Sequence, residues 1–292
     1  MSVSASQKEA AMPSVWCVVL NWNACNLLTD CLYSLMATRY NNLHIVVADN
    51  GSTDDSVETV ERTFPEVHIV ENAANLHYAA GNNPAIDFSL DHGAQYVLLL
   101  NNDTIVEPDF LKPLVEAVEN RPGSGIAGPK ILYADAPRLI WFAGADLSIW
   151  KARGTHRGIR QPDDGRFDDD TDTDYVSGCA MLVRRDVLGN VGLLDEGFQA
   201  YYEDADFCLR AQRAGFSCRY VAGSRIYHKV GASYGLMSPA KLRERLRSQL
   251  RFARKHSPPA AWFTTIPFFL FADAVRVATL TLLGRLRPKQ GF

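Results

Sequence analysis

The chain has 292 residues, 47% of them hydrophobic and 22% charged, with a formal net charge of −3 at pH 7. Length and composition are ordinary for a soluble globular protein. The chain is neither too small nor too polar to bury a sizeable core. They fit one large α/β domain or one domain with an appendage.

Charge is distributed unevenly along the chain. Residues 238–292 hold eleven Lys or Arg against Glu244 and Asp273, a net charge of +9, so the preceding residues sum to −12. A basic tail on an acidic body indicates an anionic partner for the tail, either a membrane surface or a nucleic acid. The body offers no base-reading motif, so we expect no nucleic acid partner.

The cysteines and the N-terminus bear on the compartment. The six cysteines form no CxxC pair and have no zinc-like spacing with histidine. Several lie in apolar runs, where a free thiol behaves as a small buried hydrophobe, and we expect a reducing cytoplasm. Residues 1–13 form a polar leader without the apolar region of a secretory signal.

Strands and helices alternate over the first hundred residues. The apolar periodicity predicts four strands, each followed by polar residues: "VWCVVLNWN" (15–23), "HIVVAD" (44–49), "VHIVEN" (67–72) and "YVLLLNND" (96–103). Helical spacing follows in 24–38, in 57–64 and up to about residue 90. Such alternation predicts βαβ units and a mostly parallel sheet, whose ligands collect at the carboxyl ends of the strands. Asn or Asp follows every one of the four strands.

Taken singly, the polar residues at these strand ends have ordinary explanations. Asp103 could cap a following helix, although Thr104 and Pro108 make this less natural. Asp49 begins Asp-Asn-Gly, which is a good turn sequence. His228 alone fits a structural histidine, and Asp204 alone fits the start of a helix.

Residues 120–175 give a less regular pattern, dominated by Gly, Pro and charged residues. The acidic run "DDGRFDDDTDTD" (163–174) predicts a solvated loop. It does not match a calcium-binding EF-hand, because counting from Asp168 places Thr173 where Gly is needed and Cys179 where Glu is needed.

Regular structure resumes at residue 175. "YVSGCAMLVRRDVL" (175–188) predicts a strand entering a helix. "YYEDADFCLRAQRAGF" (201–216) contains a helix with Asp206 and Arg210 one turn apart and Gly215 as a stop. Residues 217–233 predict another strand and a polar loop around His228.

The tail, residues 238–292, predicts two helices. "KLRERLRSQLRFARKH" is a basic helix, Pro258-Pro259 ends it, and 260–284 is apolar apart from Asp273 and Arg276. The stretch is long enough to span a membrane. Its central charges and basic flanks favour an interfacial anchor instead, with a protein–protein surface, such as that of a homodimer, as the alternative.

Seven segments in order resemble one family. "VVLNWN", "VVADNGSTDDS", "NLHYAAGNN", "LLLNNDT", "SGCAMLVRRDV", "YYEDADFCLRAQRAGF" and "YHKVGAS" are similar to the inverting glycosyltransferases of family 2, over about residues 14–235. The likeness is greatest to the rhamnosyltransferase-type branch that extends cell-surface polysaccharides. It implies a GT-A fold over residues 14–237, α/β with a Rossmann-like, mostly parallel sheet flanked by helices. It also implies a nucleoside-diphosphate-sugar donor of the dTDP or UDP type and a divalent cation, Mg²⁺ or Mn²⁺.

The resemblance assigns the metal site. The family's Asp-x-Asp motif falls on Asn101-Asn102-Asp103, where Asp103 matches the metal ligand and Asn101 departs from Asp. His228 matches the histidine that completes the site. A hard cation there would neutralise the charge that develops on the leaving nucleoside diphosphate. Asn101 would be a weaker, neutral contact to the donor ribose or to a metal-bound water.

The resemblance also assigns donor contacts. Asp49 matches the acidic residue that contacts the nucleobase or ribose, with Asn21 and Asn23 nearby. Asn75 and Gly81 would bring the backbone close to the donor. His77-Tyr78 stands where relatives often carry Gly-Phe, so the resemblance does not fix the shape of this loop. Ser52, Thr53 and Asp54 would shape the loop after Asp49.

The catalytic assignment falls on two adjacent carboxylates. The resemblance makes Asp204 the base that takes the acceptor hydroxyl proton, with Glu203 positioning the acceptor. Their mutual repulsion is expected to raise one pKa. A retaining route would need a nucleophile on the opposite face, and no residue suggests itself. Arg184, Arg185 and Lys229 could hold phosphate oxygens or could be surface charges.

The resulting expectation is a glycosyltransferase acting on a saccharide or lipid-linked acceptor, peripheral at the cytoplasmic face of the cell membrane. An oxidoreductase on a Rossmann sheet would need a glycine-rich first turn, which "LNWNACNLL" lacks. A degenerate, non-catalytic nucleotide-sugar-binding protein of the same fold is the alternative, supported by Asn101.

Overall fold

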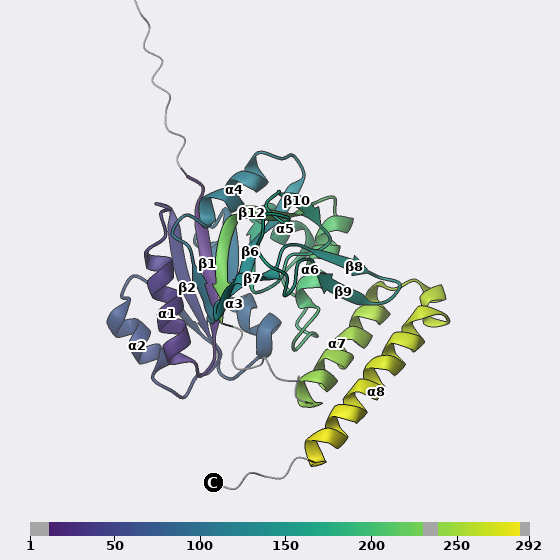
Figure 1. Ribbon diagram of the computed structural model, residues 1–292. Helices are drawn as coiled ribbons and strands as arrows, with labels where there is room; N and C mark the ends of the chain where they lie inside the picture. Colours follow the sequence, from purple (N-terminus) through teal and green to yellow (C-terminus); the bar gives the residue numbers. More distant parts are fainter. Residues whose placement is uncertain (1–11, 230–238, 287–292) are drawn as a thin grey trace, which may run out of the picture.

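The computed structural model describes residues 12–229 and 239–286, so nearly all of the predicted leader lies outside the described residues. A ten-stranded sheet runs through the body and is flanked by helices (Figure 1). The main strand order is β10-β12-β6-β11-β4-β1-β2-β3.

The first half of the sheet is parallel, as the sequence predicts. Adjacent strands β3, β2, β1 and β4 all run in one direction, because each connection is a helical crossover. The strands are β1 (Val15–Asn21), β2 (Leu43–Asp49), β3 (His68–Glu71) and β4 (Tyr96–Asn101), and the crossover helices are α1 (Cys25–Met36), α2 (Ser56–Thr63) and α3 (His77–Asp91).

The second half of the sheet contains a reversal. Strand β11 (Ala180–Arg184) is antiparallel to both β4 and β6 (Ser124–Tyr133), and β12 (Ser217–His228) is parallel to β6. Strands β6 and β12 therefore point the same way as β4, so His228 lies at the edge where β1, β2 and β4 end. The remaining elements of this half are β5 (Thr104–Val106), α4 (Leu111–Glu119), α5 (Arg185–Val191) and α6 (Glu203–Arg213).

The irregular region 120–175 is more ordered than its sequence suggests. It contains the fully buried strand β6, and then β7 (Ala136–Phe142), a hairpin of β8 (Ala145–Ser148) and β9 (Arg153–His156), and β10 (Thr171–Thr173).

The prediction of a solvated loop over 163–174 is wrong in part. The fully buried ammonium of Lys130 lies 2.7 Å from Oδ1 of Asp163, whose side chain is 11% exposed, and it also pairs with Asp168. The run supplies the counter-charges that a buried lysine requires.

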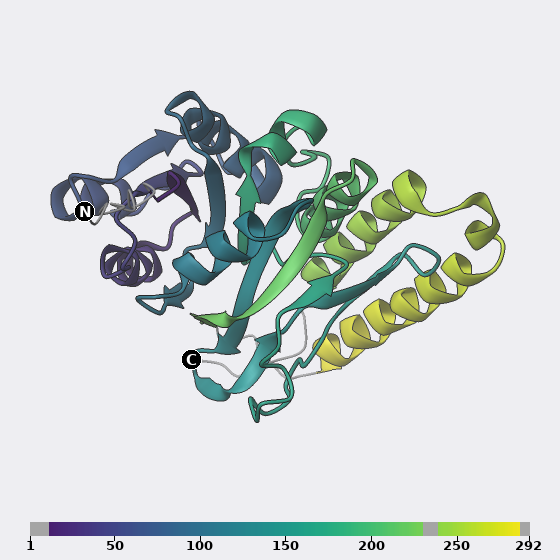
Figure 2. The same ribbon diagram turned by 90° about the horizontal axis from the view of Figure 1, so that it is seen from above.

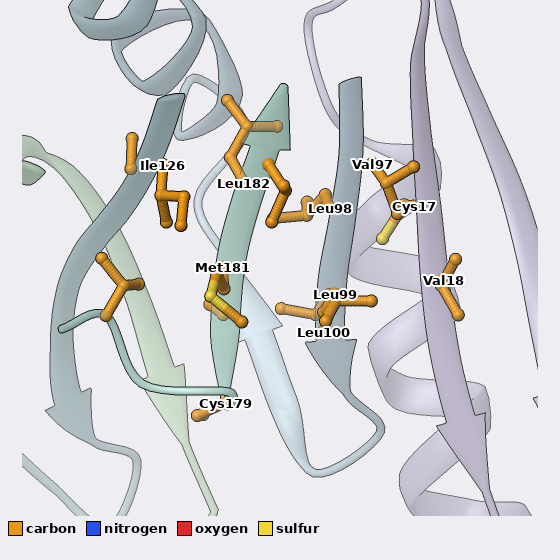
Figure 3. Close-up of a cluster of buried hydrophobic side chains, with 14 of the residues drawn as sticks. Cys17, Val18, Val97, Leu98, Leu99, Leu100, Ile126, Cys179, Met181 and Leu182 are labelled. Atoms are coloured by element: carbon orange, nitrogen blue, oxygen red, sulfur yellow. The ribbon is translucent and has the colours of Figure 1, made fainter. Parts of the chain in front are cut away.

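The core lies on the two faces of the central strands. Buried apolar side chains of β1, β4, β11 and β6 pack in one layer, among them Val18, Leu99, Met181 and Ile126 (Figure 3). These strands are covered on both faces, which is why they read as continuous apolar runs rather than as alternating patterns.

The tail forms two helices joined by a short 3-10 turn, η1 (Pro259–Trp262). Helix α7 (Pro239–His256) and helix α8 (Thr265–Leu286) lie side by side at the end of the molecule away from β1 and β2 (Figures 1 and 2). Among residues 12–229 and 239–286, no helix combines the length and the apolar character that crossing a membrane requires.

Helix α7 is part of the body rather than an appendage. The buried carboxylate of Asp206 in α6 accepts a hydrogen bond from Nε2 of His256 at 2.6 Å, and Lys255 Nζ lies 2.7 Å from it. Ser248 and Gln249 donate to backbone carbonyls of Ala200 and Ala152. The first tail helix is therefore held against the helix that begins with Glu203 and Asp204.

Candidate active site

The strand register brings the predicted site residues to one edge of the sheet. Asn21 is the partner of Asp49 across β1 and β2, and Leu20 is the partner of Asn101 across β1 and β4. His228, the last residue of β12, pairs with Thr104 of β5. Ligands of α/β sheets bind at this carboxyl edge.

Asp49 is the centre of a closed hydrogen-bonded loop. Its carboxylate accepts hydrogen bonds from the Ser52 amide (2.8 Å), the Ser52 hydroxyl (2.6 Å) and Nδ2 of Asn21 (3.1 Å). Asn23 accepts from the Thr53 amide at 2.7 Å. These bonds fix the loop after β2, and Asn23 itself has φ of 48°, in the left-handed region that asparagine tolerates.

The loop before α3 is held by Asn50. Its Nδ2 donates to the His77 carbonyl at 2.9 Å and lies 3.4 Å from Oδ1 of Asn75. Gly81 lies within α3, and a Cβ added there would be 2.6 Å from Asn50 Nδ2. The glycine thus leaves room for Asn50, and its contact with a donor stays a prediction.

Asp103 does not cap a helix. The residues after it form β5, and α4 begins only at Leu111, so the capping explanation fails. Asn101 to Asp103 form the turn between β4 and β5, and Nδ2 of Asn102 donates to Oδ1 of Asn21 at 2.8 Å. The motif is tied through this bond to the Asp49 loop.

Asp103 and His228 form a close pair. Nε2 of His228 lies 3.1 Å from Oδ1 of Asp103, but that buried oxygen and the buried Nδ1 of His228 have no hydrogen-bond partner. Burial opposes protonation of His228, whereas the Cys179 sulfur and Asp103 favour it and raise the pKa to about 10.

The unpartnered Oδ1 of Asp103 suits a cation. Because the raised pKa of His228 favours its protonated ring, a cation binding there would have to displace that proton. The described residues contain no cluster of three or more His, Cys, Asp or Glu side chains placed to hold a metal. Asp103 and His228 would supply two ligands to a divalent cation bound here, and the other ligands would have to come from groups other than these side chains.

Glu203 and Asp204 open helix α6 in different environments. Asp204 accepts hydrogen bonds from the backbone amides of Gly178 (3.0 Å) and Ala205 (2.7 Å), while Oε2 of buried Glu203 has no partner. Burial raises the pKa of both carboxyls, and the charge of Asp204 adds to the effect on Glu203, whose pKa is raised to about 8. The expected repulsion between them is present, but burial is the larger cause.

The approach to these carboxylates is strained. Tyr201 and Tyr202 both have positive φ, 68° and 70°, which costs a non-glycine residue of order 1 kcal/mol each. The Tyr202 hydroxyl donates to the Ala152 carbonyl at 3.0 Å, which holds the turn in place. The turn aims Glu203 and Asp204 at the adjoining cavity.

That cavity has a volume of about 520 Å³, and residues predicted for the metal side and for the base side both line it. Glu203 and Asp204 line it, together with Asn101 and His228. The structure therefore places Asn101, His228, Glu203 and Asp204 around one cavity. The other predicted site residues do not line it: Asn21, Asn23, Asp49, Asn75, Gly81 and Asp103.

Sequence reasoning missed part of the wall. Trp141 packs edge-on against His228 at 4.7 Å between ring centroids and against His156 at 4.8 Å. Arg153 of β9 and Arg245 of α7 also line the cavity. The "IWFAG" run (140–144) was the available signal, an aromatic strand in a region otherwise rich in Gly and charge.

A phosphate-binding role for Arg184 and Arg185 is wrong. Because β11 is antiparallel to β4, Arg184 pairs with Tyr96 at the opposite edge of the sheet, and its guanidinium binds Asp186. Arg185 donates to backbone carbonyls there. Lys229, in contrast, donates its backbone amide to the Asp103 carbonyl and lies 2.6 Å from Asp30.

Comparison with known proteins agrees with this geometry. The sequence model described as "Glycosyl transferase family 2" matches residues 16–192. An "N-acetylglucosaminyl-diphospho-decaprenol L-rhamnosyltransferase" of Mycobacterium tuberculosis is 27% identical over 77% of this chain and 80% of its own. A "dTDP-rhamnosyl transferase RfbF" of Shigella flexneri is 24% identical over 82% and 80%. The chain spans only 27% of a third relative, "Uncharacterized protein y4gI" of Sinorhizobium fredii, with 27% identity over 83% of this chain.

Solved structures share the fold. A mannosyltransferase of Pyrobaculum calidifontis, solved with GDP-Man and Mn²⁺, has a TM-score of 0.58 at 16% identity and covers 94% of this chain and 79% of its own. GalNAc-T7, solved with UDP, GalNAc and Mn²⁺, has a TM-score of 0.63 at 15% identity over 81% and 47%. These likenesses bear out the predicted GT-A architecture.

Proposed function

The chain belongs to glycosyl transferase family 2, and we propose that it transfers a sugar, with inversion, from a nucleoside-diphosphate sugar to a hydroxyl of a saccharide or lipid-linked acceptor. The observation that carries the proposal is the shared cavity of His228, Glu203 and Asp204. In this proposal His228 and the base lie at one cavity, beside the sheet edge that carries Asp103.

Asp204 is the proposed base. The two amide hydrogen bonds it accepts favour its ionised form and orient it. As the acceptor oxygen bonds to the anomeric carbon and the bond to the phosphate oxygen breaks, Asp204 takes the hydroxyl proton. Glu203, whose pKa is about 8, stays protonated near neutral pH and can donate a hydrogen bond to the acceptor.

Asp103 and His228 would hold the metal, Mg²⁺ or Mn²⁺. When bound, the cation would stabilise the negative charge on the departing nucleoside diphosphate. Asn101 lines the same cavity and would contribute a neutral contact. The Asp49 loop and Asn21 would take the nucleoside, with Asn23 and Asn75 shaping its surroundings.

The sugar we propose is rhamnose, carried by dTDP. Two relatives have rhamnosyl transfer in their names, and one of those names includes dTDP. A lipid-linked acceptor rests on the decaprenol in the other name and on the tail, whose exposed aromatic residues suit the cytoplasmic surface of a membrane: Phe263, Phe268 and Phe271.

Calorimetric titration of dTDP, UDP and GDP, each with Mn²⁺ and with EDTA, tests the proposal. We expect one nucleotide to bind, and to bind only with the metal. Absence of binding to folded protein would contradict the proposed donor site, whereas binding without turnover of any nucleotide sugar would favour the degenerate binder that Asn101 suggests. Binding without turnover of dTDP-rhamnose would leave the nucleotide class but remove the proposed sugar.

A further inference from the structure

Two arginines of the cavity wall form no ion pair with a carboxylate among residues 12–229 and 239–286. Arg153 and Arg245 are both half-buried, and within the described parts of the chain neither pairs with a carboxylate. The segment 230–238, which lies outside those parts, contains no Asp or Glu. Nearby arginines are paired by contrast, Arg157 with Asp146 at 2.6 Å and Arg251 with Asp195 at 2.9 Å.

The charge of Arg245 reaches the groups inside the cavity. It acts on Tyr201, where burial raises the pKa and Arg245 lowers it. It also acts on His156, where burial is the main cause that lowers the pKa to about 4. Two guanidinium groups that line one cavity make it more positive, and a bound anion would offset that charge.

The two arginines stand on the side of the cavity away from the expected donor. They come from β9 and α7, which both views show far from β1 and β2, the strands that end in Asn21 and Asp49 (Figures 1 and 2). A nucleotide at the Asp49 loop would place its phosphates by Asp103 and His228. The arginine pair is thus left for a second anionic group.

Arg153 also touches the apolar tail helix. Its guanidinium lies 5.8 Å from the centre of the Phe269 ring on α8, next to the exposed Phe268 and Phe271. The hydroxyl of Thr265 donates to the Trp150 carbonyl, which fixes α8 against the β8–β9 hairpin. Arg153 therefore links the cavity, which Glu203 and Asp204 also line, to the aromatic side chains of α8.

We propose that Arg153 and Arg245 form a phosphate subsite for the acceptor, and that the acceptor is an amphiphile whose phosphate separates its sugar from an apolar chain lying on α8. This inference rests on the proposed function and names its acceptor class. Guanidinium groups bind phosphate through paired, charge-assisted hydrogen bonds, which suits this position.

The test uses dodecyl phosphate below its micellar concentration as the probe, titrated into the full-length protein. We expect Arg153→Gln and Arg245→Gln each to raise its Kd about tenfold or more, as loss of a charge-assisted phosphate contact does. Arg247→Gln is the matched control, because Arg247 lies on α7, is 77% exposed and does not line the cavity. Its Kd should stay within about twofold, the range of a surface contact.

Two further probes identify the source of the phosphate. Inorganic pyrophosphate should compete with dodecyl phosphate, whereas neutral dodecyl maltoside should bind far more weakly. Equal binding of the neutral amphiphile, or unchanged affinity in both arginine variants, overturns the proposal. If the variants lose only binding to phosphatidylglycerol vesicles, the arginines serve a lipid headgroup surface and the acceptor subsite is refuted.

The nucleotide titration separates this inference from the proposed function. The variants should bind nucleotide with Mn²⁺ as the unmodified protein does. Nucleotide affinity lost only in the variants would move the arginines to the donor site and overturn the inference, leaving the function standing. Nucleotide binding absent from the unmodified protein would instead overturn the function.

Discussion

The two adjacent carboxyl groups at the start of α6, Glu203 and Asp204, have the same chemistry but different hydrogen bonds. Asp204 is fixed by two backbone amides, whereas Glu203 has a buried oxygen without a partner. A carboxylate held by amides is a ready proton acceptor, and a carboxyl kept neutral by burial is a hydrogen-bond donor. One dipeptide thus holds two carboxyl groups in different environments, which the proposed function uses for two different roles.

Replacing Asp204→Asn should lower kcat on the order of 10²- to 10⁴-fold, because a general base is removed while the shape is kept. Steady-state assays with excess acceptor measure this. Metal-dependent nucleotide affinity, measured in parallel, should be unchanged. A variant that turns over at the normal rate would show that another group takes the proton.

Glu203 predicts an unusual pH dependence of stability. Its folded pKa of about 8 lies above the ordinary glutamate value, so the folded state binds the extra proton. The stabilisation is complete below the unfolded pKa and is lost as pH rises towards 8. Glu203→Gln should cancel this loss, worth more than about 1 kcal/mol between pH 5 and 8.5.

Urea denaturation of both proteins at several pH values measures the effect. The difference in unfolding free energy between variant and unmodified protein should grow with pH. A difference that does not change with pH would mean that Glu203 titrates normally.

Asp103→Ala should abolish the metal dependence of nucleotide binding. The remaining His228 is a single ligand, and a hard cation prefers oxygen. Calorimetry with Mn²⁺ and with EDTA should then give the same weak affinity. Asn102→Ala is a nearby control, which removes only the bond to Asn21. Metal-dependent affinity that survives in Asp103→Ala would remove the ligand role.

At the scale of elements, α6 and α7 behave as one unit. Asp206 is fully buried and is contacted by His256, Lys255 and Arg210. Burial alone would raise its pKa, but these partners lower it. The pairing therefore stabilises the fold fully when the pH is above the pKa of aspartate in the unfolded chain. This stabilisation is lost as the pH falls towards the lowered pKa of Asp206 in the folded protein.

Asp206→Ala should cost about 3 to 5 kcal/mol of unfolding free energy, since it leaves buried cations unpaired. Chemical denaturation at pH 7 measures it. Asp186→Ala is a matched control, because its pair with Arg184 is partly exposed and should matter by less than about 1 kcal/mol. Equal losses in the two variants would show that the buried network contributes nothing specific.

The sequence predicted the elements whose pattern is local. Strands β1, β2 and β4 and helix α6 were expected from apolar periodicity alone, since each buried face is spelled out within ten or so residues. Strand β6 was missed because Gly125, Gly128 and Pro129 resemble a loop. In the sheet, Gly125 and Gly128 have no room for a Cβ against Val187 and Val176.

The site residues also divide into those that a local motif predicts and those that depend on long-range contacts. Asp103, Asp204 and His228 could be expected from motifs, and the register of the sheet brings the strand ends at Asp103 and His228 to one edge. Arg153, Arg245 and Trp141 could not, because their relevance depends on how β7, β9 and α7 meet, far apart in sequence. Lys130 was unexpected for the same reason: its partners lie more than thirty residues away.

For the molecule as a whole, the tail divides after α7. Deleting residues 258–292 removes α8 but keeps His256, so the fold should persist while the protein moves from the membrane fraction to the supernatant. Flotation with anionic vesicles measures this. Deleting from residue 238 should instead unfold the body, because buried Asp206 loses His256 and Lys255. Membrane binding that survives the shorter deletion would locate the anchor elsewhere.

The hydrogen bond between His256 and Asp206 also constrains the order in which the chain can fold during synthesis. Chains are made from the N-terminus, and domains fold as their residues become available. Helix α6 emerges with its buried carboxylate only partly neutralised, and it waits for about fifty more residues before His256 arrives. The helix that begins with Glu203 and Asp204 therefore gains its full set of buried ion pairs only after α7 has been synthesised.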